Sequence, residues 1–195
     1  MNPRTVLALL VTSLLLQAPW VLAGEQVVTL VPETSSIRFT LGATLHTVHG
    51  TVPLERGELR LDPDAHGLTG EVVADLARAE TGNGSRDKKM HREVLRTGEH
   101  PTAVLRVAGY EGDFASTGTS RITLRGEMVL LGKAHEVAVP ADVTVTGGRV
   151  DVRAVFEVPY VAWGLEDPSA FLLRVDKTVE VEVEARGTVS ELPQG

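Results

Sequence analysis

The stretch Thr178-Val179-Glu180-Val181-Glu182-Val183-Glu184 alternates valine with glutamate after its first residue. Successive side chains of a β-strand point to opposite faces, so a period of two places the valines on one face and the carboxylates on the other. Strands of a parallel sheet are buried on both faces and read as continuous apolar runs. The alternation therefore predicts an antiparallel strand with one buried face.

The same period recurs along the chain, in residues 36–41, 57–62, 120–125 and 149–154. Further segments rich in β-branched residues are also predicted as strands: 27–31, 68–76, 103–108, 127–131 and 136–146. Turns rich in Gly, Pro and Asp separate them. Short strands at this spacing predict an all-β sandwich or barrel. Few aromatic residues are present, and inward positions are mostly Val, Leu, Ile and Ala, which favours a hollow barrel.

Residues 85–97 contain neither Pro nor Gly and depart from the period of two. Ser85 is predicted as the N-cap of a helix, Asp87 favours its first turn, and Gly98 is predicted to end it. The apolar residues of this segment recur at helical spacing, as Met90, Val94 and Leu95. Residues 159–173 are predicted as a long packed loop with a helical turn after Asp167-Pro168.

The first residues, 1–23, have the pattern of a secretory signal peptide. Arg4 supplies a positive start, residues 6–16 form an apolar run interrupted only by a Thr and a Ser, and Ala23 suits a cleavage site. The run is too short to span a bilayer, which needs about 20 residues. We therefore expect cleavage near Gly24, followed by one domain over residues 24–190.

Composition narrows the class of protein. Without the predicted signal, which holds one Arg and no acid, 18 basic and 26 acidic residues remain, a net charge of −8. Such a surface repels phosphate backbones, so nucleic acid is excluded as a partner. The chain has no cysteine. A domain of this length is stable without disulfides, and export without cysteine fits a bacterial periplasm, or a secreted protein, better than a eukaryotic extracellular module.

Four stretches in order resemble the YceI-like family of bacterial polyisoprenoid-binding periplasmic proteins. They are residues 36–39 running on to 49–52, residues 80–87 through 100–102, residues 125–140, and residues 175–187 preceded by Trp163-Gly164. The resemblance implies an antiparallel eight-stranded lipocalin-like barrel with one short helix near the barrel end. It also implies an apolar tunnel for an isoprenoid or fatty-acyl lipid. Some aromatic residues that are usual in the family are replaced, for example by Val52, Val94-Leu95 and His100.

The predicted ligand-binding residues are the apolar side chains of the inward phase, the helix and the irregular loop. Each of them taken singly is expected in any barrel core, and the set as a whole favours a cavity. They are Ile37, Phe39, Leu41, Leu61, Met90, Leu95, Leu105, Ile122, Leu124, Met128, Leu130, Phe156, Trp163 and Phe171.

Polar candidates for chemistry are weaker. Arg86 and Asp87 could clamp a polar headgroup, but we favour a structural role, with Asp87 at the helix start and Arg86 in a salt bridge that holds the loop. His46 and His49 lie three apart, so on a strand they point to opposite faces and are poorly placed for one metal ion. No nucleophile motif is present. We therefore predict no catalytic residue, no metal site and no cofactor.

The leading hypothesis is a non-enzymatic protein that binds, stores or carries a long-chain amphiphile. A second is a stress-response or interaction module built on a filled barrel, and a third is an esterase-like or redox accessory enzyme. Cavity volume separates the first two, and a convergent polar cluster inside the cavity would favour the third. The sequence leaves a homodimer open.

Overall fold

The computed structural model describes residues 25–44, 46–62, 65, 67–169 and 174–191. This part of the chain contains ten strands and one short helix, in which α1 continues directly into the π-helical turn η3. No helix in it is long and apolar enough to cross a membrane. The elements are β1 (Gln26–Leu30), η1 (Pro32–Thr34), β2 (Ser36–Leu41), β3 (Val48–Val52), β4 (Leu54–Asp62), β5 (Gly67–Asp75), η2 (Leu76–Arg78), α1 (Gly84–Lys89), η3 (Met90–Val94), β6 (Thr102–Glu111), β7 (Gly118–Leu130), β8 (Lys133–Thr146), β9 (Arg149–Val158) and β10 (Val179–Glu191).

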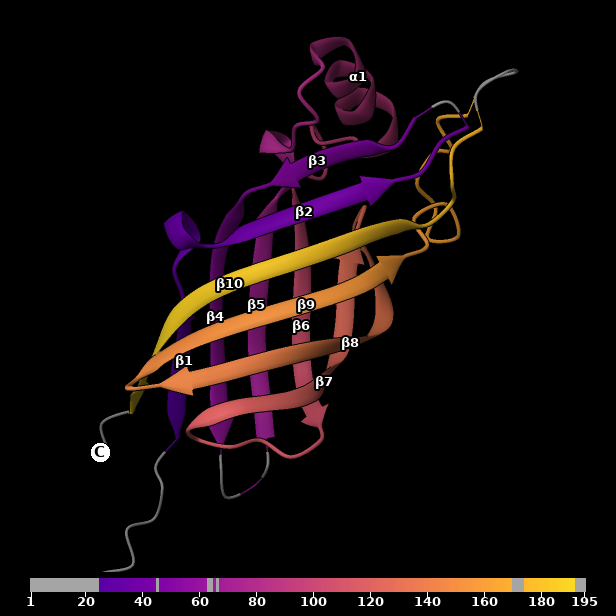
Figure 1. Ribbon diagram of the computed structural model, residues 1–195. Helices are drawn as coiled ribbons and strands as arrows, with labels where there is room; N and C mark the ends of the chain where they lie inside the picture. The colour runs from indigo at the N-terminus through magenta and orange to yellow at the C-terminus, as the bar shows by residue number, and fades with distance from the viewer. Residues whose placement is uncertain (1–24, 45, 63–64, 66, 170–173, 192–195) are drawn as a thin grey trace, which may run out of the picture.

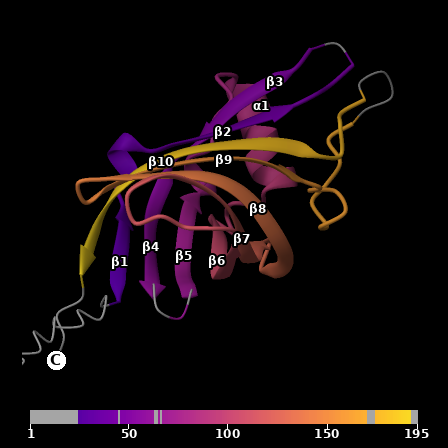
Figure 2. The same cartoon turned by 60° about the horizontal axis from the view of Figure 1, so that its bottom comes forward.

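Eight strands close into an antiparallel barrel, as the sequence predicts. The ring runs β1-β4-β5-β6-β7-β8-β9-β10, and the pairing of β10 with β1 closes it. In Figure 1, β8, β9 and β10 cross in front of β4, β5 and β6, which run at a steep angle behind them. Figure 2 shows the same two walls from the end opposite α1. An eight-stranded ring is wide enough for its interior to be filled by side chains or to hold one small ligand.

The hairpin of β2 and β3 lengthens the wall at one end. The long strand β10 pairs with β1 over residues 187–191 and with β2 over residues 180–184. The short η1 turn lies between β1 and β2, so the two strands occupy successive stretches beside β10. Figure 1 shows that the hairpin and α1 lie at the same end of the barrel.

The predicted alternation is confirmed in strand β4, where Leu59 and Leu61 are buried and the intervening Glu58 and Arg60 are exposed. Two predicted strands, residues 120–125 and 127–131, form the single long strand β7. Strand β3 was not among the predicted strands, because it is short and its Gly50 weakens the alternating pattern. The predicted signal peptide, and most of the predicted helical turn after Asp167, lie outside the described residues.

The helix is present, but its start and its second half differ from the prediction. Asn83, and not Ser85, is the N-cap: its side-chain oxygen accepts hydrogen bonds from the backbone N–H groups of Ser85 and Arg86, both at 3.1 Å. The later turn is π-helical, and Leu95 donates its N–H to the Met90 carbonyl at 2.8 Å. Asn and Ser are both good N-caps, so the sequence alone does not choose between neighbouring candidates.

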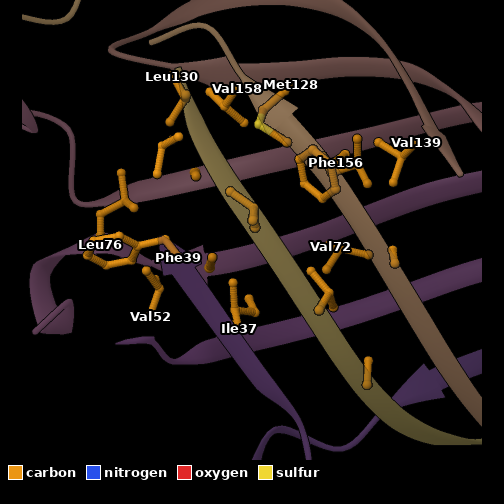
Figure 3. A pocket seen from close by; sticks show the side chains of 18 of the residues that line it. Ile37, Phe39, Val52, Val72, Leu76, Met128, Leu130, Val139, Phe156 and Val158 are labelled. Carbon is orange, nitrogen blue, oxygen red and sulfur yellow. The ribbon is translucent and has the colours of Figure 1, made fainter. Parts of the chain in front are cut away.

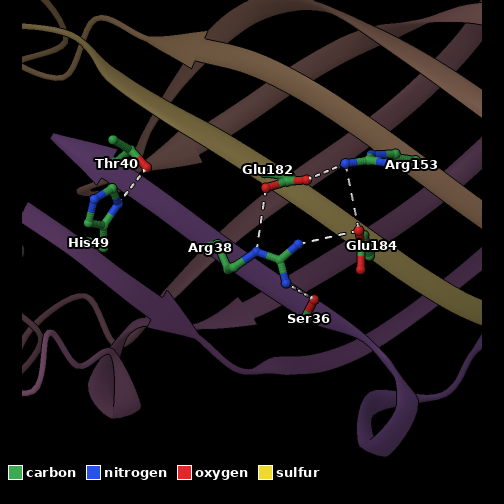
Figure 4. A network of polar contacts seen from close by, with 7 residues as sticks. All are labelled: Ser36, Arg38, Thr40, His49, Arg153, Glu182 and Glu184. Carbon is green, nitrogen blue, oxygen red and sulfur yellow. Dashed lines mark hydrogen bonds and ion pairs between the residues drawn. The ribbon is translucent and has the colours of Figure 1, made fainter.

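The outer face of the barrel carries a network of ion pairs across β2, β10 and β9 (Figure 4). Arg38 contacts Glu182 at 3.4 Å and Glu184 at 3.3 Å, and Arg153 contacts Glu182 at 2.8 Å. Hydrogen bonds from Arg153 and Arg38 lower the pKa of Glu182 below its ordinary value. The glutamates of the stretch that defines the strand pattern therefore face outward.

Candidate functional site

The barrel encloses a cavity of about 750 Å³. Ligand-binding cavities in proteins commonly measure about 300–1,000 Å³. The wall is formed by inward side chains from every strand of the ring, and by residues of the β2–β3 hairpin, η2 and the helix. Figure 3 shows part of this wall, with Ile37, Phe39, Val72, Met128 and Phe156 pointing into the interior.

The interior stays hollow because its side chains are short. In the part of the chain that the structure describes, the buried apolar residues form four clusters, each against one sector of the wall. One cluster joins β7, β8 and β9 around Val139, which is 2% exposed. Another lies at the helix end around Leu76 and Val158. Valine and alanine do not reach the axis of an eight-stranded barrel, so the clusters leave space between them.

Most of the predicted ligand-binding residues line this cavity. Two do not support the prediction: Trp163 lies outside the lining, and Phe171 is not among the described residues. The predicted residues that do line it are Ile37, Phe39, Leu41, Leu61, Met90, Leu95, Leu105, Ile122, Leu124, Met128, Leu130 and Phe156. The structure thus places these residues in the cavity wall, and their contact with a ligand stays a prediction.

Trp163 belongs to a covering loop, residues 159–165, that closes the wall near the helix end. Its indole stacks on the His135 ring of β8, with centroids 4.4 Å apart and planes 4° apart. Two other residues of the covering loop, Tyr160 and Leu165, line the cavity. The Tyr160 hydroxyl donates to the Asp176 carbonyl at 2.7 Å, and burial raises the pKa of Tyr160 to about 12. Trp163 therefore packs the covering loop onto β8 and the core cluster at the helix end, without lining the cavity.

A contact between two strands was missed by sequence reasoning. Phe39 of β2 lies directly opposite Gly50 of β3 in the register, and its ring covers the glycine. A Cβ atom at Gly50 would lie 2.3 Å from Phe39 Cζ and 2.6 Å from the Glu80 carbonyl oxygen. The glycine therefore makes room for the ring at the cavity wall. A Gly in a strand can indicate such a close approach, and this was the available signal.

The far end of the cavity was missed as well. Tyr110 and Phe114 line it and meet edge to face, with centroids 6.2 Å apart and an interplanar angle of 66°. Two polar residues, Gln26 and Ser116, also line the cavity. Phe114 follows a strand end and lies in an irregular segment, so no periodic pattern could assign it a face.

Arg86 and Asp87 hold the loop before the helix, as the favoured structural interpretation states, but the predicted salt bridge is wrong. Arg86 Nε donates to Thr81 Oγ1 at 2.7 Å, and its Nη2 donates to the Thr81 carbonyl at 2.9 Å. Asp87 accepts a hydrogen bond from the Thr81 N–H at 3.0 Å. Both side chains thus meet at Thr81, because a threonine offers a donor and acceptors at once.

The two neighbouring histidines do not come together on a metal. His49 Nδ1 lies 3.1 Å from Thr40 Oγ1 on the outer face (Figure 4), whereas His46 lines the cavity. Within the described ranges, no group of three or more His, Cys, Asp or Glu side chains could hold a metal ion.

The ring of antiparallel strands and its apolar interior define a lipocalin-like barrel with an internal cavity. The YceI-like domain model matches residues 29–186, most of the chain. The chain therefore belongs to the YceI-like domain family. No curated protein sequence matches it.

Solved structures with the same fold include a polyisoprenoid-binding domain from Saccharophagus degradans implicated in plant cell wall breakdown. It is 16% identical, with a TM-score of 0.65 over 84% of this chain and 98% of that chain. BcnA from Burkholderia cenocepacia is 13% identical, with a TM-score of 0.67 over 82% of this chain and 99% of that chain. The YceI protein of Campylobacter jejuni is 11% identical, with a TM-score of 0.54 over 71% and 81%. At these identities the likeness shows a shared fold.

Proposed function

We propose that this protein binds a single-chain amphiphile, an isoprenoid or a fatty-acyl lipid, with the chain inside the barrel and without chemical conversion. The apolar cavity of about 750 Å³ inside the barrel carries the proposal. The relative from Saccharophagus degradans, described as a polyisoprenoid-binding domain, supports the choice of ligand class. Family membership and the signal-like first residues support a periplasmic location.

The cavity volume bounds the ligand. A water molecule takes about 30 Å³ in the liquid, and at that volume per atom the cavity holds roughly 25 non-hydrogen atoms. That is the size of about five isoprene units, or of a long fatty-acyl chain. At about −0.3 kcal/mol per atom, such a ligand would gain about −7.5 kcal/mol, which corresponds to a Kd of about 3 μM.

The other two hypotheses receive less support. A module built on a filled barrel requires side chains across the axis, and the cavity of about 750 Å³ is not filled by them. An enzyme requires a convergent polar group inside the cavity. Apart from Gln26 on β1, the strand residues of the described wall are apolar or aromatic, and most of its polar members belong to α1 and the segment before it.

Native mass spectrometry of protein purified from its own host tests the proposal. We expect an added mass of a non-covalent lipid on the wild type and on Val155→Trp, a control at an outward position that is 45% exposed. Met128→Trp should carry much less, because the indole occupies space in the wall. A wild type without added mass, and without affinity for long-chain isoprenols or fatty acids, would overturn the proposed function.

A further inference from the structure

The face of the helix that lines the cavity is apolar only in its second half. From η3 onward, the lining residues are Met90, Val94 and Leu95, as expected for a buried helix face. In α1, the lining residues include Arg86 and Lys89. Residues three and four apart share a helix face, so both cations lie beside the apolar stripe. The stripe of a helix that faces a core is normally apolar, and these two charges depart from that pattern.

The charges of the wall have one sign. The chain as a whole has a net charge of −7, with 26 acidic residues. Among the described residues that line the cavity, however, there is no Asp and no Glu, whereas Arg86 and Lys89 are present. The charged side chains of the cavity wall are therefore opposite in sign to the net charge of the chain.

Arg86 is oriented but has no anionic partner. Its guanidinium is half-buried and is held by the two hydrogen bonds to Thr81. No carboxylate of the described residues lies within the 4.0 Å ion-pair distance of it, since Asp87 binds Thr81 instead. A guanidinium has five N–H donors, so donors are left over after Thr81 is bound. The Asp87 carboxylate reaches this guanidinium only through the Thr81 hydroxyl, which accepts from Arg86 and donates to Asp87. An anion in direct contact with the guanidinium would add charge-assisted hydrogen bonds.

Lys89 lies one turn further along the helix. Its ammonium reaches Glu93 only at 3.9 Å, a long contact between an exposed lysine and a half-buried glutamate. A flexible ammonium at such a distance is available to a second anion, because surface ion pairs of this kind contribute little.

We propose that Arg86 and Lys89 form a subsite for the oxyanion headgroup of the bound amphiphile, a phosphate or a carboxylate. This inference rests on the proposed function, because the tail must occupy the barrel. The guanidinium binds oxyanions through paired N–H donors, and the lysine adds a point charge. The order of residues on the helix, cations first and then Met90, Val94 and Leu95, matches an amphiphile whose head lies at α1 and whose chain passes into the cavity.

Three probes with a chain of the same length distinguish the contribution of the headgroup from that of the alkyl chain. They are hexadecanol, hexadecanoate and hexadecyl phosphate, and each competes with a neutral fluorescent alkyl probe. We expect the wild type to bind both anions about tenfold more tightly than the alcohol, since one charge-assisted hydrogen bond is worth about that factor. In Arg86→Gln/Lys89→Gln, the preference should disappear while the alcohol affinity stays unchanged. The variant Arg86→Lys should keep part of the preference for the anionic probes over the alcohol. Lys88→Gln is the matched control, because Lys88 is exposed and does not line the cavity.

The outcomes are distinct. If the wild type binds the three probes equally, the headgroup subsite is wrong and the proposed function stands. If no probe binds, the proposed function fails, and the inference falls with it. If the double variant loses the alcohol as well as the anions, Arg86 acts through the loop that it holds, and the subsite is again overturned. If only one of the two anions is preferred, the head is assigned to phosphate or to carboxylate.

Discussion

The length of the bound chain provides a quantitative test of the hollow barrel. If the cavity of about 750 Å³ takes roughly 25 non-hydrogen atoms at about 30 Å³ each, affinity should rise with chain length up to that size and then stop rising. At the same net gain of about 0.3 kcal/mol per non-hydrogen atom, each added carbon should lower the Kd by about 1.6-fold until the cavity is full, since tenfold equals about 1.4 kcal/mol.

Leu105→Trp should shorten the chain length at which affinity stops rising, which we call the break in this series. Leu105 lines the cavity from β6 and pairs across the sheet with Met128 of β7. A tryptophan side chain has about six more non-hydrogen atoms than a leucine side chain, so the largest chain that fits should fall from about 25 to about 19 atoms at the same volume per atom. Chains shorter than the new break should bind with nearly unchanged affinity.

The assay is competition of a series of saturated alcohols against a fluorescent alkyl probe, with the melting temperature of each variant measured in parallel. Val155→Trp, which adds a similar side chain on the outer face, should leave the break where the wild type has it. A filled core would respond differently, because adding an indole to a packed interior costs about 1–3 kcal/mol of stability. A break at the same length in Leu105→Trp and the wild type, or affinity independent of length, would refute the reasoning.

Four further predictions concern stability and processing. Gly50→Val should cost about 1–3 kcal/mol of unfolding free energy in urea melts, because its Cβ would strike Phe39; an unchanged midpoint would contradict that contact. Met90→Asp should lower the melting temperature and the stability by about 2 kcal/mol, since it places a charge on the apolar stripe, and an equal melt would show that stripe to be solvated. The lowered pKa of Glu182 means that its ion pairs stabilise the fold above pH 4.5 and are lost as the pH falls further, so Glu182→Gln should lose less stability on acidification than the wild type; parallel curves would argue against this. Intact-mass analysis of periplasmic protein should show that residues 1–23 have been removed, and their retention would contradict the signal peptide.

Local patterns were sufficient for the eight strands of the ring and for β2, whereas β3 was missed. The alternation in residues 178–184 predicts strand β10, and the structure places its glutamates in the outer ion-pair network. A period of two is a local property of an extended chain, so it can be read without knowing which strands pair. The apolar face of the helix was predictable because helical spacing is also a local property of the chain. Met90 and Leu95 of this face do line the cavity.

The helix start and the ends of the cavity were less predictable. Choosing Asn83 over Ser85 as the cap depends on which side chain is positioned to accept the first N–H groups. Assigning Trp163 to the outside of the covering loop depends on the nearby His135 ring, 28 residues earlier in the chain. Irregular segments have no period, so an aromatic residue there can face either side.

Side-chain alternation and ordered motifs were enough to predict an antiparallel all-β domain, the inward face of its alternating strands and the family. The tertiary structure was needed to show that the inward side chains leave a cavity. Volume at the axis depends on the closure of β10 on β1 and on how far side chains from opposite walls reach, and both are relations between residues distant in sequence. It also decided that Arg86 and Lys89 face this cavity without a carboxylate on its described wall, since a charge acquires such a role only from what surrounds it.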